Sequence, residues 1–188
     1  PERVSPSENS EDDRQFVSQI NILESSNMIG KKVEEGRLPG FEDITIRVIK
    51  RGNETFLPPF QDHTIIKEGD IIAISGVKKS IASLVSKRPN IFVKNMHMED
   101  IDNSYDKSKN LTIQNANLAE VVSSPASRMI GQTIKSAGFY SKYHCPVLAI
   151  QRKGSLLKTK ITDLRLVAGD VLLIIGEMSR FIDLKRSK

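Results

Sequence analysis

The sequence predicts an α+β protein built from two tandem small domains, each a mainly antiparallel sheet with helices on one face. Three observations predict this class. The chain repeats itself, each copy holds several short β-branched runs of strand length, and each copy ends in one short amphipathic segment of helical period. The repeated segments, in order along each copy, are Ser26–Val33 with Ser127–Ile134, Ile44–Gly52 with Cys145–Gly154, and Gly69–Gly76 with Gly169–Gly176.

The period of the repeat sets the domain organisation. It is roughly 100 residues, far longer than the repeats of solenoid proteins, so each copy is expected to be a small domain with its own core. The boundaries we expect are a disordered arm at 1–14, a first domain at 16–86, a linker at 87–109 and a second domain at 110–188. Within the linker region, Ile91–Val93 could form an additional strand against either copy or remain part of the linker.

Each copy is expected to open with a strand and a capped helix. Short apolar runs around Val17 and around Leu118 suit the opening strands. Ser26 and Ser127 are placed to cap a helix in which the core-facing residues lie four apart. The glycines of this segment, Gly30 and Gly131, would then lie inside the first helical turn, where close approach of a backbone or a ligand is the expected reason for them.

The second half of each copy reads as strands, a turn and a closing helix. A central strand ends at Arg51 or Arg152, and return strands are expected at 55–57 and 155–157. A Gly-Asp pair then makes a tight turn, in which the Asp accepts backbone N–H groups, and it leads into an almost wholly apolar strand. The residues of these turns are Gly69, Asp70, Gly169 and Asp170. The closing helices carry Ile81, Leu84 and Val85 in the first copy and Phe181 and Leu184 in the second, and these faces are where we expect copies or subunits to meet.

Composition limits the classes of protein that fit. The single cysteine, Cys145, excludes an internal disulfide and fits a small core hydrophobe in a cytosolic protein. A net charge of +5 raises the question of nucleic acid, but the basic residues are scattered and lack interleaved aromatic residues, so we expect no nucleic-acid partner. The chain has no unbroken apolar run of about 18 residues that could span a membrane. Because it begins at Pro1 without an initiating Met, we expect it to have been cut from a longer chain.

No constellation of residues indicates catalysis or a cofactor. The sequence contains neither a dinucleotide-binding glycine motif nor a phosphate-binding loop. His63, His97 and His144 are far apart, and His144 with Cys145 would point to opposite faces of a strand. We therefore expect a protein that is not an enzyme and that carries no metal and no resident cofactor.

The order of the repeated anchors resembles a known regulatory domain. The anchors are Ser-x-x-Ile-Gly-Lys at Ser26, a strand ending at Arg51-Gly52, and Gly-Asp-Ile-Ile-x-Ile-x-Gly from Gly69, followed by a short helix. They resemble the C-terminal regulatory domain of TrkA and RCK proteins, which control potassium conductance. The resemblance covers both copies, and it implies an α+β module that dimerises and acts as a ligand-sensing or coupling part of a cation channel or transporter.

The tandem arrangement resembles a narrower group. Two such copies without a nucleotide-binding domain before them look like the cytosolic insert of bacterial permeases of the sodium–sulfate or dicarboxylate symporter family, or the tail of a cation–proton antiporter. This implies a cytoplasmic domain of an inner-membrane protein, with the membrane-spanning part of the parent transporter as its partner. A homodimer or pairing of copy on copy is also expected. The alternative is a stand-alone protein-interaction scaffold of paired domains.

The resemblance also bears on ligands. Some relatives bind cyclic di-adenosine monophosphate through an Asp-x-Arg-like segment, and the matching stretch here, Gly138–Tyr143, has neither residue. If a small anionic or nucleotide ligand binds, the candidate positive contacts are Lys31, Arg51, Lys142 and Arg152. The alternative for the two arginines is that each anchors the turn that follows its strand.

Overall fold

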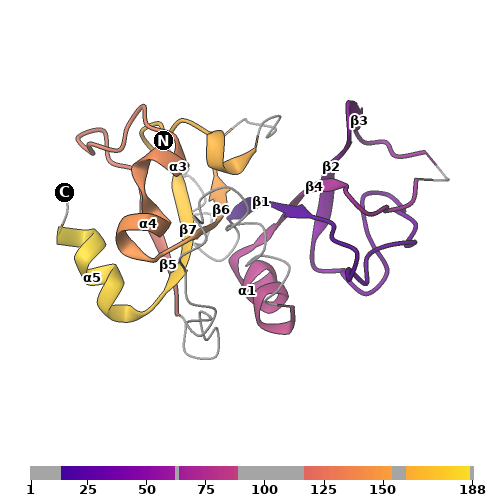
Figure 1. The fold of residues 1–188 in the computed structure, drawn as a ribbon, viewed down its shortest axis with the longest axis horizontal. Helices are drawn as coiled ribbons and strands as arrows, with labels where there is room; N and C mark the ends of the chain where they lie inside the picture. The colour runs from indigo at the N-terminus through magenta and orange to yellow at the C-terminus, as the bar shows by residue number, and fades with distance from the viewer. Residues whose placement is uncertain (1–13, 62–63, 89–116, 154–159, 187–188) are drawn as a thin grey trace, which may run out of the picture.

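One sheet crosses the whole molecule. The computed structural model describes residues 14–61, 64–88, 117–153 and 160–186. Seven strands lie in the order β3-β2-β4-β1-β6-β7-β5, and every described pairing is antiparallel. Figure 1 shows the sheet running from the first copy to the second, coloured indigo to magenta and then orange to yellow. The strands are β1 (Gln15–Asn21), β2 (Thr45–Arg51), β3 (Glu54–Phe56), β4 (Ile71–Val77), β5 (Asn117–Val122), β6 (Val147–Gln151) and β7 (Val171–Gly176).

The repeat in the sequence is a repeat in the fold. In the first copy β4 lies between β1 and β2, and in the second copy β7 lies between β5 and β6. The connecting backbone repeats as well: the Ile22 N–H donates to the Asp70 carbonyl, and the Ser123 N–H donates to the Asp170 carbonyl. The prediction of two copies of one α+β module is confirmed.

The copies join through their edge strands. β1 pairs with β6, placing Val17 opposite Ile150 and Ser18 opposite Ala149. Because β1 and β6 are antiparallel, the second copy runs in the reverse direction along the sheet. A half-turn of this kind exchanges the two faces of the sheet, so the helices of the two copies are expected on opposite faces.

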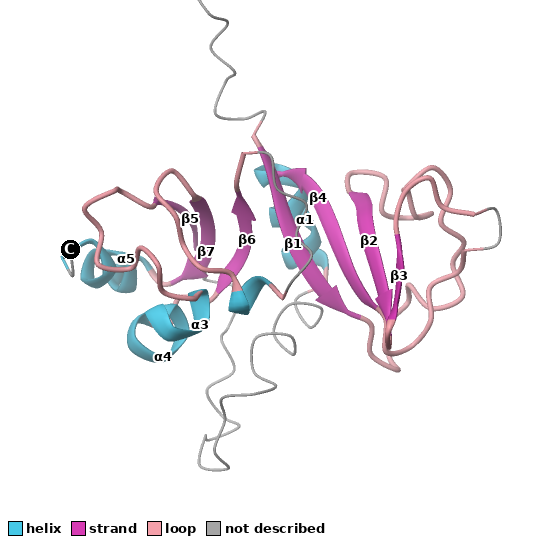
Figure 2. Ribbon diagram, turned by 90° about the horizontal axis from the view of Figure 1, so that it is seen from above, coloured by secondary structure: helices cyan, strands magenta, loops and turns pink. Residues whose placement is uncertain are grey.

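The helices follow this arrangement (Figure 2). Along β7, Leu173 and Ile175 belong to a core that includes α1 (Lys78–Lys87). Leu172 and Ile174 belong to a second core, which includes residues of α3 (Ile134–Ala137), α4 (Phe139–Tyr143), α5 (Met178–Arg186) and the short 3₁₀ helix η3 (Ile161–Asp163). Each copy therefore keeps its helices on one face, as predicted, but the two copies use different faces.

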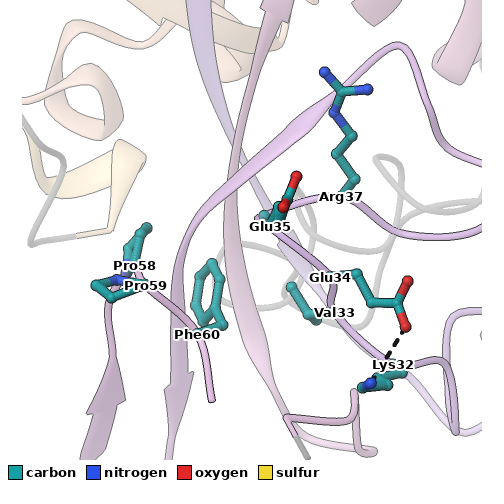
Figure 3. Close-up of a pocket in the computed structure, with 9 residues that line it drawn as sticks. Lys32, Val33, Glu34, Glu35, Arg37, Pro58, Pro59 and Phe60 are labelled. Atoms are coloured by element: carbon teal, nitrogen blue, oxygen red, sulfur yellow. Dashed lines mark ion pairs between the residues drawn. The ribbon is translucent and has the colours of Figure 1, made fainter. Parts of the chain in front are cut away.

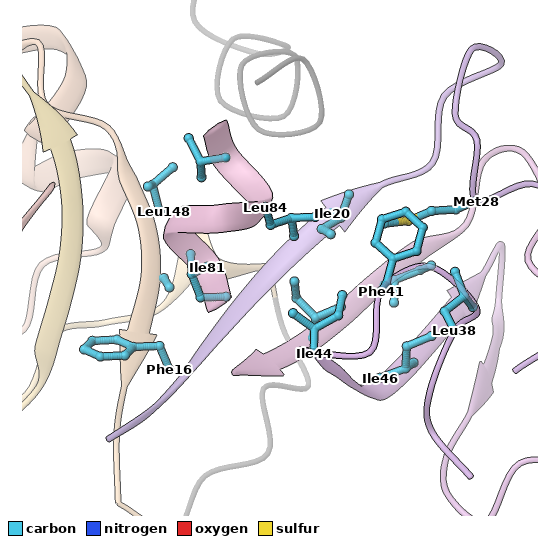
Figure 4. Close-up of a cluster of buried hydrophobic side chains, with 14 of the residues drawn as sticks. Phe16, Ile20, Met28, Leu38, Phe41, Ile44, Ile46, Ile81, Leu84 and Leu148 are labelled. Atoms are coloured by element: carbon cyan, nitrogen blue, oxygen red, sulfur yellow. The ribbon is translucent and has the colours of Figure 1, made fainter. Parts of the chain in front are cut away.

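The first core is shared by both copies. Figure 4 shows Leu148, from β6, beside Ile81 and Leu84 of α1. Phe16 and Ile20 of β1 complete this junction. The prediction that the Ile81–Leu84–Val85 face makes a contact between copies is confirmed for the first copy.

The segment after each opening strand differs from the prediction. Residues 26–33 and 127–133 form turns and isolated bridges in place of the expected helix. Ser26 and Ser127 accept hydrogen bonds from Met28 N–H and Met129 N–H, so the serines cap turns. The reason is backbone geometry: Gly30 has φ of 78°, and its N–H donates to the Ile66 carbonyl across the domain. A Cβ at Gly30 would meet nothing within 4 Å, so close packing does not explain this glycine.

The return strand of the first copy and the closing helices of both copies were predicted correctly. The first return strand is present as β3, and the closing helices are present as α1 and α5. The second copy also has α3 and α4 where the first has loops, and α3 begins with reciprocal hydrogen bonds between Thr133 and Ser136. Residues 1–13 of the arm expected at 1–14, most of the linker with Ile91–Val93, and the return strand expected at 155–157 lie outside the described residues.

Candidate functional site

Arg51 is held by a buried carboxylate. Asp70 is fully buried, and its two oxygens accept hydrogen bonds from Arg51 Nε at 2.7 Å and Arg51 Nη2 at 2.8 Å. The same Nη2 donates to the Ile65 carbonyl, and the Lys67 N–H donates to Asp70 Oδ2. The hydrogen bonds that Arg51 donates to Asp70 raise the pKa of Arg51 above its ordinary value. This two-pronged pair fastens the end of β2 to the Gly-Asp turn before β4.

The second copy repeats this arrangement atom for atom. Arg152 Nε and Nη2 donate to Asp170 at 2.7 and 2.6 Å, and Nη2 also donates to the Arg165 carbonyl. The Val167 N–H donates to Asp170 Oδ2. The predicted role of each Asp as an acceptor of backbone N–H groups is confirmed. Both arginines therefore have the contacts of turn anchors.

The four predicted ligand contacts do not form one cluster. Arg51 ends β2 and Arg152 follows β6, and these strands run in opposite directions, so the two arginines lie at opposite ends of the strands. Lys31 Nζ donates to the Pro39 carbonyl at 2.9 Å. Lys142, on α4, lies with its aliphatic stem against Gly138. Their role in ligand binding remains a prediction.

A hollow of about 900 Å³ opens in the first copy. Figure 3 shows Pro58, Pro59 and Phe60 on one side and the Lys32–Glu34 ion pair on the other, with Nζ and Oε1 3.3 Å apart. The hollow is lined by Lys32, Val33, Glu34, Glu35, Gly36, Arg37, Pro58, Pro59 and Phe60. It combines an apolar wall with charges of both signs, which suits a small ligand that has an apolar part and an ionised part.

Sequence reasoning did not identify this hollow. Its residues belong to the turn at Glu34–Arg37, closed by mutual backbone hydrogen bonds, and to the segment after β3. The available signal was the departure of the first copy from the second: where the first forms this turn, the second forms α3.

Contacts across the junction of the copies form a second feature of functional interest. Glu120, on β5, accepts hydrogen bonds from Lys78 Nζ at 2.9 Å and from Arg14 Nη1 at 3.1 Å, both in the first copy. Gln19 Oε1 accepts from the Ile161 N–H at 3.0 Å, so a β1 side chain holds the start of η3. The Ser18 hydroxyl donates to the Leu148 carbonyl beneath α1. Polar side chains of both copies therefore join across the junction.

Cys145 is a core residue, as predicted. Its side chain is buried, and its thiol donates to the Tyr143 carbonyl. Burial raises the pKa of the thiol to about 11.

Among the described residues, no group of three or more His, Cys, Asp or Glu side chains is placed to hold a metal ion. None of the helices in the described ranges has the length and apolar character needed to cross a membrane.

Comparisons with known proteins point to transporters. The chain is 25% identical, over 93% of its length, to an uncharacterised transporter of Synechocystis, and 22% identical, over 86% of its length, to a probable sodium/sulfate cotransporter of Chlamydomonas reinhardtii. It spans 28% of the first relative and 17% of the second. Among solved structures, the RCK domain of GsuK aligns with 93% of this chain and 63% of its own, at 10% identity and a TM-score of 0.35.

The family model of the TrkA-C domain matches twice. The matched residues are 17–87 and 118–187, which together cover most of the chain and correspond to the two structural copies. Each match contains an opening strand, an Arg–Asp pair and a closing helix. The chain therefore belongs to the TrkA-C domain family and carries two copies of the domain.

Proposed function

We propose that this chain is the cytoplasmic regulatory module of a membrane transporter. The observation that carries the proposal is the double TrkA-C match in a chain whose relatives are transporters several times its length. In this proposal the module's partner is the membrane-spanning part of the parent, and the module itself catalyses no reaction.

The joined sheet supports a coupling role. The two copies share one core through Leu148 and α1, and Glu120 ties β5 to the first copy. A ligand or partner that shifts one copy therefore disturbs buried contacts of the other, and packed junctions of this kind respond by switching between discrete arrangements. We propose that the two copies act on the transporter as one unit.

A small anionic or nucleotide ligand completes the proposal. The net positive charge favours anions, and the lining of the hollow includes a basic residue, Arg37, as well as the apolar Phe60. Lys31 and Lys142 are further candidate contacts. A ligand that binds the folded state raises the melting temperature, so a thermal-shift screen of nucleotides, cyclic dinucleotides, sulfate and dicarboxylates tests this part.

A matched pair of variants locates any such ligand. Arg37→Ala removes the basic group of the hollow, whereas Lys50→Ala removes an exposed charge from β2. We expect the first to abolish the thermal shift and the second to keep it. A shift that survives Arg37→Ala places the ligand elsewhere, and the absence of any shift removes ligand sensing while leaving coupling intact.

Transport measurements test the central proposal. The parent transporter, reconstituted in vesicles, is compared with a version in which Glu120→Gln and Gln19→Ala loosen the junction of the copies. We expect an altered maximal flux with little change in apparent substrate affinity, because the substituted residues lie in the regulatory module. Unchanged flux in this variant, and in a variant lacking the whole module, would contradict a regulatory role.

A homodimer is also part of this proposal.

A further inference from the structure

The outer edge of β5 has an occupied counterpart in the first copy. β5 corresponds to β1, and the edge of β1 that faces away from β4 pairs with β6. The same edge of β5, which faces away from β7, has no strand beside it among the described residues. The repeat thus shows what kind of element fits this edge: an antiparallel strand that carries an aliphatic side chain.

A groove beside β5 marks the missing aliphatic side chain. Leu148, on β6 of the second copy, packs against Ile81 and Leu84 of α1 in the first copy. All three side chains are buried. The counterparts of the α1 residues, Phe181 and Leu184 of α5, line an open groove of about 540 Å³ together with Val121 and Met129. The groove lies where Leu148 would lie if the second copy were covered as the first copy is.

Three exposed residues on β5 and α5 are apolar in the second copy, whereas their counterparts in the first copy are not large and apolar. Val122, Met178 and Ile182 are 61%, 61% and 49% exposed. By the register of the repeat their counterparts are Asn21, Lys78 and Ala82. Met178, Phe181 and Ile182 share one stripe of α5, and Phe181 lines the groove. Val122 pairs with Val171, so its side chain lies on the other face of the same open edge. None of the three exposed side chains packs in either buried core. Their exposure therefore indicates a surface that another protein chain covers.

The open edges of the sheet select the occupant. In a second copy of this chain, the outer edge of β2 is already paired with β3, and β6 is paired with β1. β5 is the remaining long open edge of the described strands, and it contains neither the Pro nor the Lys that protects isolated edges. Two β5 strands can pair antiparallel about a two-fold axis perpendicular to the sheet. In that arrangement the α5 faces of both chains lie on the same side of the joined sheet. This brings the two grooves and the two α5 stripes together.

We propose that the chain forms a closed homodimer in which β5 pairs with β5 of a second copy and the α5 stripes cover each other. This inference specifies the surface of the self-association included in the proposed function. It assigns Met178 and Ile182 to the contact between the α5 stripes, and Val122 to the paired β5 edge on the other face of the sheet.

Sedimentation equilibrium of the full chain, from low micromolar to near-millimolar concentration, tests the proposal. We expect a dimer whose dissociation constant rises by roughly tenfold or more in Met178→Lys and in Ile182→Lys, because each places a charge in the apolar contact between the α5 stripes. Both side chains are exposed in the monomer, so folding should persist, and circular dichroism checks this. The matched control is Val167→Lys, an exposed residue away from the groove whose counterpart is Lys67, and it should leave the constant unchanged.

Hydrogen exchange on the unmodified chain provides a second readout. Amides of Asn117–Val122 should gain protection as concentration rises, whereas those of Glu54–Phe56 on the opposite edge should not. A monomer at every concentration, a dimer insensitive to both substitutions, open-ended assembly, or unprotected β5 amides in the dimer would each overturn the proposal. A monomeric chain whose removal still alters flux in the parent transporter would overturn this inference alone and leave the proposed function standing.

Discussion

Arg51 and Asp70 form a two-pronged ion pair, with Nε and Nη2 2.7 and 2.8 Å from the carboxylate oxygens. Asp70 is fully buried, whereas the Arg51 side chain is 27% exposed. Removing the arginine should therefore cost more stability than removing the carboxylate, since a buried charge without a partner is costly.

This asymmetry predicts unequal effects of removing each partner. Arg51→Met leaves a buried, uncompensated carboxylate and should lower the free energy of unfolding by about 3 kcal/mol. Asp70→Asn keeps one acceptor oxygen and should cost less. Urea unfolding measures both, with Lys50→Met on the same strand as a control that should change little. A loss from Arg51→Met no larger than that of the control would show that the pair does not anchor the turn.

The junction of the copies predicts a salt-dependent contribution from Glu120. Glu120→Gln removes the charge that Lys78 and Arg14 share, and it should cost about 1 kcal/mol of unfolding free energy because these groups are only partly buried. The difference should shrink at high salt, since screening weakens the original pairs. Urea unfolding at two salt concentrations checks this, with exposed Glu68→Gln as the control. A salt-independent difference would argue against an ion pair in solution.

Gly176 lies against Cys145. A Cβ at Gly176 would be 2.8 Å from Cys145 Sγ and 3.3 Å from a ring carbon of Phe181, so Gly176→Ala should destabilise the chain by about 1 to 3 kcal/mol. Cys145→Ala removes the sulfur, so the same substitution should cost less in that background. A double-mutant cycle by thermal or urea unfolding measures the coupling. Additive effects would mean that the backbone shifts to avoid the contact.

The buried thiol predicts a pH dependence at the alkaline end. The pKa of Cys145 is raised from 9.0 to about 11, so the unfolded chain loses this proton before the folded chain does. The contribution to stability is fully present below pH 9 and is lost as the pH rises toward 11. Unfolding curves of the unmodified chain and Cys145→Ser across this range should converge or cross as the pH increases. In the folded state the thiol should also react slowly with iodoacetamide, and rapid modification at neutral pH would contradict its burial.

The sequence allowed the repeated part of the fold to be predicted more fully than the rest. Strands, Gly-Asp turns and closing helices have local patterns, and each occurs twice. The Arg–Asp pairs could also have been predicted, because Arg51 with Asp70 and Arg152 with Asp170 repeat at nearly the same spacing. The helix expected after Ser26 was wrong because the local pattern did not reveal that Gly30 adopts a positive φ and pairs across the domain.

The relation between the copies was not predictable in this way. Pairing of β1 with β6 and the half-turn that separates the helices depend on which strand edges meet, and no local pattern specifies that choice. The hollow at Lys32–Arg37 was not predicted for a similar reason. It lies where the first copy departs from the second, so the repeat gives no guide to its structure.

The short strand β3 has a consequence for assembly. It occupies against β2 the position that β1 occupies against β6. Without β3, one chain would offer both an open β2 edge and an open β5 edge, and head-to-tail addition of chain upon chain could continue without limit, as in a fibre. Three residues, Glu54–Phe56, with the Arg51 guanidinium 5.2 Å from the centre of the Phe56 ring, thus terminate a modular array at one end and favour soluble assemblies of finite size.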